Sequence, residues 1–79
     1  MQVTLKYFAI LREQRGLSEE TLYTELPTAG ELYKHLKEEH GFSLNPNQLR
    51  IAVNDTFVSS ETELKDGDVL VFIPPVAGG

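Results

Sequence analysis

Alternating apolar and polar residues mark two strands at the start of the chain. Val3, Leu5 and Tyr7 alternate with polar residues, which is the period of two of a strand with one buried face. We predict a first strand over residues 2–9. The same alternation returns over residues 21–26 and predicts a second strand, paired with the first as a hairpin.

A helix is predicted to follow, from Thr28 to His40. Thr28 and Glu31 match the capping box, in which each side chain satisfies a backbone donor at the helix start. Gly41 suits a left-handed C-terminal cap. Apolar residues recur at helical spacing and form one stripe: Ala29, Leu32, Tyr33 and Leu36.

The C-terminal half returns to strand patterns. We predict, in order, a loop at residues 42–48, a strand over residues 49–53, a short return strand at Phe57 and Val58, a turn at residues 66–68 and a final strand over residues 69–73. One helix would then pack across one mixed sheet of four to five strands, which is an α+β fold. The 79 residues suit a single domain.

The final strand has apolar residues on both of its faces, so both faces should be shielded from water. If Leu70 and Phe72 pack under the helix, every second residue faces outward. We expect the outward residues to form an apolar docking patch: Phe8, Phe57, Val71 and Ile73. A bulge or a local helical turn at Ala9 would instead rotate Phe8 into the core.

The charge of the chain narrows the classes of partner. Seven Lys and Arg against twelve Asp and Glu give a net charge of -5 with no basic cluster, which argues against nucleic acid or an anionic membrane. A partner with a basic surface fits better. The first residues alternate and no apolar run approaches transmembrane length, so we expect no signal peptide and no membrane span, and we expect a cytoplasmic protein.

Residue types that carry chemistry are sparse. The chain has no cysteine, so any sulfur chemistry must use sulfur brought from outside. His35 and His40 are too far apart along a helix to share one face, and we expect no metal site. Asp66 and Asp68 predict a turn rather than a calcium loop, and nothing suggests a nucleophilic triad.

The last six residues predict an extended tail. Two prolines deny the sheet its hydrogen bonds and stiffen the exit, and a terminal Gly pair has no β-carbons, so it could thread a narrow channel. The tail comprises Pro74, Pro75, Val76, Ala77, Gly78 and Gly79. Short Gly-rich ends are also often simply disordered, and the pair alone is weak evidence.

The whole chain resembles the MoaD family of ubiquitin-like β-grasp sulfur carriers, whose members are small subunits of molybdopterin synthase. Three segments carry the likeness. They contain Phe8, Ala9, Arg12 and Glu13; then Ala52, Val53 and Asn54; then Leu64, Asp66, Gly67, Asp68, Val71, Phe72, Pro74, Pro75, Val76, Gly78 and Gly79.

This resemblance implies a function for the tail. A ubiquitin-activating-like adenylyltransferase would use ATP to convert Gly79 to a glycyl adenylate, and a sulfur donor would displace AMP to leave a thiocarboxylate, 1-thioglycine. That terminus would enter the large synthase subunit, in a heterotetramer of two small and two large subunits, and give sulfur to a cyclic pterin phosphate in molybdenum cofactor biosynthesis. Gly78 and Ala77 would keep the tail slim, and residues 74–76 would direct it. The chain would bind no cofactor and supply no acid or base.

Three other functions stay open at this point. The thiamine-pathway sulfur carriers share the Asp-Gly-Asp turn and the terminal glycines, although they differ where Pro74 and Pro75 stand. A ubiquitin-like modifier uses the same activation chemistry, but such proteins usually carry basic residues before their glycines, and this chain has none there. The third is a plain interaction domain with an unused tail.

Overall fold

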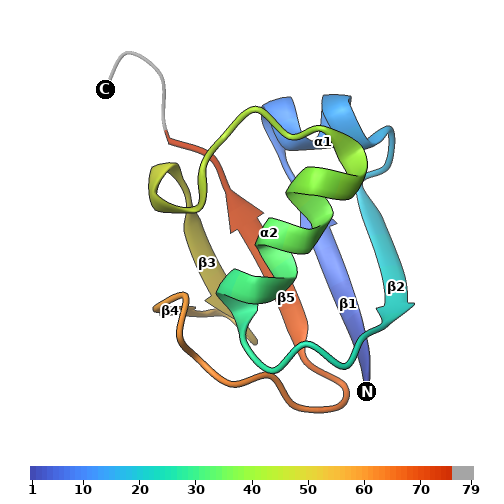
Figure 1. Cartoon of the computed structure of the whole chain (residues 1–79), viewed down its shortest axis with the longest axis vertical. Helices are drawn as coiled ribbons and strands as arrows, with labels where there is room; N and C mark the ends of the chain where they lie inside the picture. Colours follow the sequence, from blue (N-terminus) through green and yellow to red (C-terminus); the bar gives the residue numbers. More distant parts are fainter. Residues whose placement is uncertain (76–79) are drawn as a thin grey trace.

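The computed structural model describes residues 1–75, which fold as one sheet crossed by a helix. Along the chain the elements are β1 (Gln2–Tyr7), α1 (Ala9–Arg15), β2 (Glu19–Tyr23), α2 (Ala29–His40), the 3-10 helix η1 (Pro46–Gln48), β3 (Arg50–Val53), β4 (Thr56–Val58) and β5 (Val69–Ile73). Helix α2 runs diagonally over one face of the sheet, and the central strand β5 points toward the end of the sheet that lies away from the N-terminus (Figure 1).

The sheet has five strands in the order β2-β1-β5-β3-β4. The central pair, β1 and β5, is parallel, and the other three pairs are antiparallel. The predicted α+β fold with a mixed sheet is therefore confirmed, and the arrangement is that of a β-grasp.

The first two strands differ from the prediction by two residues or more, each for a physical reason, whereas β3 and β4 differ by one residue each. The first strand ends at Tyr7 because Ala9 adopts a φ of 49° and begins α1, a helix that the sequence indicated only as an alternative local turn at Ala9. The second strand spans Glu19–Tyr23 rather than residues 21–26. Its partner sets this limit, since β1 residues 2–6 pair with residues 19–23 and the chain beyond runs past the start of β1.

Helix α2 ends at His40 as predicted and begins one residue after Thr28, which is its N-cap. The Thr28 side chain accepts a hydrogen bond from the Glu31 backbone N–H at 3.2 Å, which is one half of the predicted capping box. Gly41 adopts the left-handed conformation and donates its N–H to the Lys37 carbonyl. A full capping box lies instead at η1, between Asn45 and Gln48, inside the segment predicted to be a loop.

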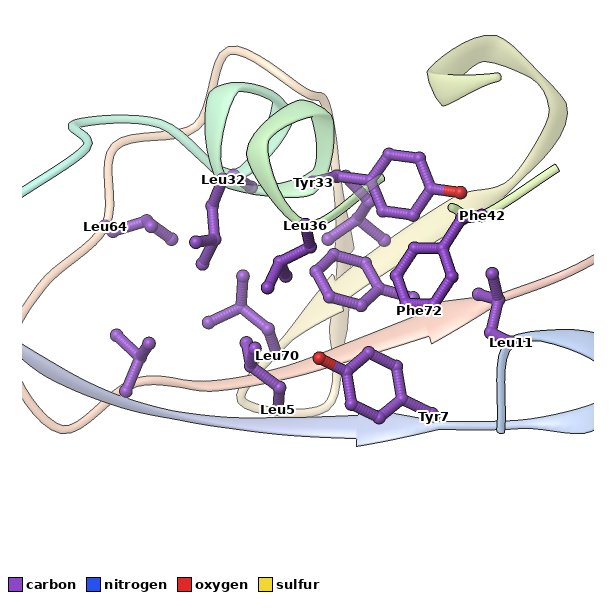
Figure 2. Close-up of a cluster of buried hydrophobic side chains, with 13 residues drawn as sticks. Leu5, Tyr7, Leu11, Leu32, Tyr33, Leu36, Phe42, Leu64, Leu70 and Phe72 are labelled. Carbon is purple, nitrogen blue, oxygen red and sulfur yellow. The ribbon is translucent and has the colours of Figure 1, made fainter. Parts of the chain in front are cut away.

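Aromatic rings fill the space between α2 and the sheet. The rings of Tyr7, Tyr33, Phe42 and Phe72 have neighbouring centroids 5.2 to 6.1 Å apart, and all four side chains are buried (Figure 2). Phe42 reaches this cluster from a predicted loop because the turn at Gly41 brings its backbone N–H to the Lys37 carbonyl. Leu70 and Phe72 lie under the helix as predicted, and neither is accessible to solvent.

Candidate partner-docking site

The outer face of the sheet, opposite α2, carries a row of side chains that crosses four strands. Val71 on β5 lies between Lys6 on β1 and Ala52 on β3, and Ala52 lies next to Phe57 on β4. Because side chains alternate along a strand, all four point away from the buried Leu70 and Phe72 face. Val71 and Ile73 are partly exposed, which confirms their predicted outward direction.

Phe8 lies at the end of β1 and is also outward. Tyr7 pairs with Phe72, so continuing the same parallel register by one residue places Phe8 beside Ile73. A helical turn does begin at Ala9, yet Phe8 stays 49% exposed. The reason is that Phe8 precedes the turn with extended backbone, and Leu11 takes the buried position of α1.

A groove lies where the chain leaves the sheet. It has a volume of about 670 Å³ and is lined by residues 47–50, Phe57 and residues 73–75. The structure thus brings four of the predicted docking residues together: Phe57, Ile73, Pro74 and Pro75. Val71 and Phe8 do not line the groove and belong to the adjoining outer face.

Arg50 is the one charged residue among the described residues that line this groove, and it was not predicted from the sequence. Its guanidinium carbon lies 3.7 Å from the centroid of the Phe57 ring, within the range of a cation–π contact. Arg50 lies opposite Ile73 in the β3–β5 pair. The signal was present in the sequence, since Arg50 alternates with Leu49 and Ile51 in the predicted third strand and so lies on the opposite face from them.

Hydrogen bonds at the other end of β5 fix the register of the outer face. The Asn54 amide nitrogen donates to the Asp68 carboxylate at 2.9 Å, and the Asn54 amide oxygen accepts from the Val69 N–H at 3.0 Å. Asp68, 8% exposed, also accepts from the Lys65 N–H at 2.8 Å. These bonds hold the start of β5 against the end of β3, which keeps Val71 beside Ala52.

An ion pair connects α1, whose N-cap is Phe8, to the sheet. Arg15 donates to the Glu20 carboxylate at 2.8 and 2.9 Å, and the Tyr7 hydroxyl donates to it at 2.7 Å. The bonds from Arg15, then that from Tyr7, hold the pKa of Glu20 below its usual value, whereas burial raises the pKa of Tyr7. Glu20 is therefore charged at neutral pH and holds both ends of the α1 segment.

Over residues 1–75, no three His, Cys, Asp or Glu side chains come close enough together to hold a metal ion. Within that range, too, no helix has the length and apolar character needed to cross a bilayer. His35 lies 3.1 Å from the Glu39 carboxylate, and the His40 ring lies 5.8 Å from that of Phe42.

Four predicted site residues lie outside the described part of the chain. They are Val76, Ala77, Gly78 and Gly79. The proposed roles stay predictions: Val76 directs the tail, Ala77 and Gly78 keep it slim, and Gly79 carries the reactive group.

The chain is similar to one protein family and to several named proteins. The sequence profile of the ThiS family matches residues 5–79. The molybdopterin synthase sulfur carrier subunit of Escherichia coli (strain K12) is 34% identical over 80 residues, which cover 98% of this chain and 99% of that protein.

Two solved structures share the fold over nearly the full length of both chains. One belongs to the protein–protein complex of subunits 1 and 2 of molybdopterin-converting factor from Helicobacter pylori 26695, with 30% identity, a TM-score of 0.69 and coverage of 100% of both chains. The other is the small archaeal modifier protein 1 from Methanosarcina acetivorans, with 26% identity, a TM-score of 0.77 and coverage of 99% of this chain and 96% of that one.

Proposed function

This chain belongs to the ThiS family, and we propose that within it the chain is the sulfur carrier subunit of a molybdopterin synthase. The observation that carries the proposal is the 34% identity to the Escherichia coli subunit of that name, which covers nearly all of both chains. The Gly78-Gly79 end supports it from the sequence.

The proposed chemistry begins with a carboxylate that resists nucleophiles. Its charge is delocalised and oxide is a poor leaving group, so Gly79 must first be activated. An adenylyltransferase transfers AMP from ATP to the Gly79 carboxylate and releases pyrophosphate. A sulfur donor then attacks the carbonyl carbon, AMP leaves, and Gly79 ends as a thiocarboxylate. The absence of cysteine agrees with sulfur supplied from outside.

The proposed partner is the large synthase subunit, which docks on the outer face of the sheet. Support comes from the Helicobacter pylori relative, whose structure is a complex of subunits 1 and 2. In this chain Phe57, Ile73 and Pro74 gather at the point where β5 ends. A partner seated there lies beside the root of the tail. Two small and two large subunits would form the assembly, in the cytoplasm, and the large subunit would supply the acid and base for transfer to the pterin.

A second candidate is a ubiquitin-like modifier that joins its terminal glycine to lysines. The 26% identical archaeal modifier favours it, because the same activated terminal glycine can be used for sulfur transfer or for conjugation. The fold does not separate the two functions. Conjugates to other proteins, seen on blots of cell extract, would favour the modifier over the carrier.

Deletion of Gly79 tests the carrier role. We expect the truncated protein to keep its fold, because residues 1–75 contain the whole described core, and to lose sulfur transfer. The assay combines the activating enzyme, a sulfur donor, the large subunit and the cyclic pterin phosphate. Lys34→Gln, an exposed change on α2 on the opposite face, is the matched control. Undiminished pterin synthesis by the truncated protein would contradict the proposal.

A further inference from the structure

We propose that Arg50 binds a carboxylate side chain of the large subunit and so helps to select that partner. The inference depends on the proposed function, because it concerns the protein that covers the outer face. Among residues 1–75, Arg50 is the single charge in a groove otherwise lined by polar amides and apolar side chains.

The Phe57 ring orients the Arg50 guanidinium. With the guanidinium carbon 3.7 Å from the ring centroid, one face of the planar group is occupied by the ring. The N–H groups of a guanidinium lie in its plane and form a fork that matches a carboxylate. Stacking therefore restrains the side chain and leaves the fork available to a ligand.

Arg50 and Phe57 also lie between two grooves. Arg50 and Phe57 line the 670 Å³ groove beside Pro74 and, together with Ser59, a second groove of about 410 Å³. A partner that fills either hollow contacts the pair. An aromatic ring with a stacked Arg is the kind of contact that contributes strongly to protein interfaces.

Two of the cations in the described residues have acidic partners within the chain, and Arg50 is not one of them. Lys6 lies 3.8 Å from Glu19 and Arg15 lies 2.8 Å from Glu20. Over residues 1–75, no carboxylate lies within salt-bridge distance of Arg50. A partner that docks on Phe57 and Ile73 removes water from Arg50, and a charge desolvated without a counter-ion is costly.

The partner must therefore offer an anion at this point. The net charge of -5 suggests a partner that is basic overall, yet the groove carries the opposite sign locally. An Asp or Glu surrounded by apolar side chains on the large subunit satisfies both the charge and the apolar lining. Such local complementarity favours the right partner and excludes one that presents a cation there.

Charge reversal tests the inference by binding. We expect Arg50→Glu to weaken the affinity for the purified large subunit at least about tenfold, measured by calorimetry at low and high salt. Lys34→Glu changes the net charge equally on the opposite face and should leave the affinity within about twofold. Equal affinities of the two variants, with both folded by circular dichroism, would overturn the inference. Failure of the wild-type protein to bind the large subunit would contradict the proposed function itself, and this inference with it.

Cross-linking identifies the ligand group. Arg50→Lys places an amine at the same position, and a carbodiimide joins amines to carboxylates in direct contact. We expect a mass spectrum of the cross-linked complex to show position 50 joined to an Asp or Glu of the large subunit. Cross-links at other lysines with none at position 50, or a cross-link from position 50 to a carboxylate of its own chain, would overturn the inference.

Discussion

Phe8 is the residue where the end of β1, the start of α1 and the proposed docking face meet. It is 49% exposed although it directly follows the buried Tyr7. Its extended backbone keeps the strand direction for one residue longer, and only then does the chain turn into α1. Such an aromatic side chain contributes little to the core and much to a surface that a partner covers.

Replacing Phe8 with Ala should therefore weaken binding more than folding. We expect the free energy of unfolding to fall by no more than about 1 kcal/mol, because half of the side chain is already in water. The affinity for the large subunit should fall at least about tenfold. Urea unfolding and calorimetry measure the two effects.

Tyr23 offers the matched control for Phe8. It is a 78% exposed aromatic that pairs with Gln2, at the far end of the sheet. Tyr23→Ala should leave the affinity unchanged. Unfolding of the Phe8→Ala protein would show that Phe8 belongs to the core instead.

Among the helices and strands, those with a repeating apolar pattern could be predicted from the sequence. Features that depend on contacts between elements could not. Several apolar residues agree on the stripe of α2 and on the two apolar faces of β5. The bounds of β5 are those predicted, and α2 begins one residue after the predicted Thr28. Helix α1 has seven residues and buries Leu11 alone, so it offers no periodicity to detect. Likewise the outward face followed from alternation, whereas the Arg50–Phe57 contact depends on the β3–β4 register.

Helix α2 contains a glycine whose role is visible only in the packed structure. A β-carbon at Gly30 would lie 2.7 Å from the Ser60 β-carbon and 2.9 Å from the Ser60 carbonyl oxygen. The Gly30 N–H donates to that same carbonyl at 2.8 Å. The segment that leads from β4 toward β5 therefore passes directly over the start of α2.

Gly30→Ala should accordingly destabilise the protein. Ala is favoured over Gly within a helix by about 1 kcal/mol, but the clash with the Ser60 backbone should outweigh this gain and cost about 1–3 kcal/mol net. Ser60→Gly in the same chain removes one of the two clashes and should restore part of the loss. A thermal melt in which Gly30→Ala is more stable than wild type would show that the two segments pack less closely.

Over the whole molecule, stability should depend on pH through the buried tyrosines. Burial raises the pKa of Tyr33 from 10.0 to about 12, and its hydroxyl donates to the Leu44 carbonyl at 2.8 Å. A pKa that is higher in the folded state means that folding favours the neutral form. The stabilisation is therefore complete below pH 10 and is lost as the pH rises toward 12.

Alkaline unfolding measures this effect. Between pH 10 and 12 we expect the free energy of unfolding to fall by roughly 2 kcal/mol from Tyr33, with a further loss from Tyr7. Tyr33→Phe should be less stable at neutral pH by about 1 kcal/mol, since it loses the bond to Leu44. It should also show a shallower decline above pH 10. Parallel declines in the two proteins would contradict the assignment to Tyr33.

The central claim is that Gly79 carries sulfur, and an intact-mass spectrum tests it most directly. The protein is purified from cells that also overexpress its activating enzyme, and the C-terminal peptide is then analysed separately. The account predicts a mass that corresponds to sulfur in place of one terminal oxygen, confined to that peptide and absent after Gly79 deletion. An unchanged mass, with the activating enzyme shown to be competent on a known carrier, would contradict it.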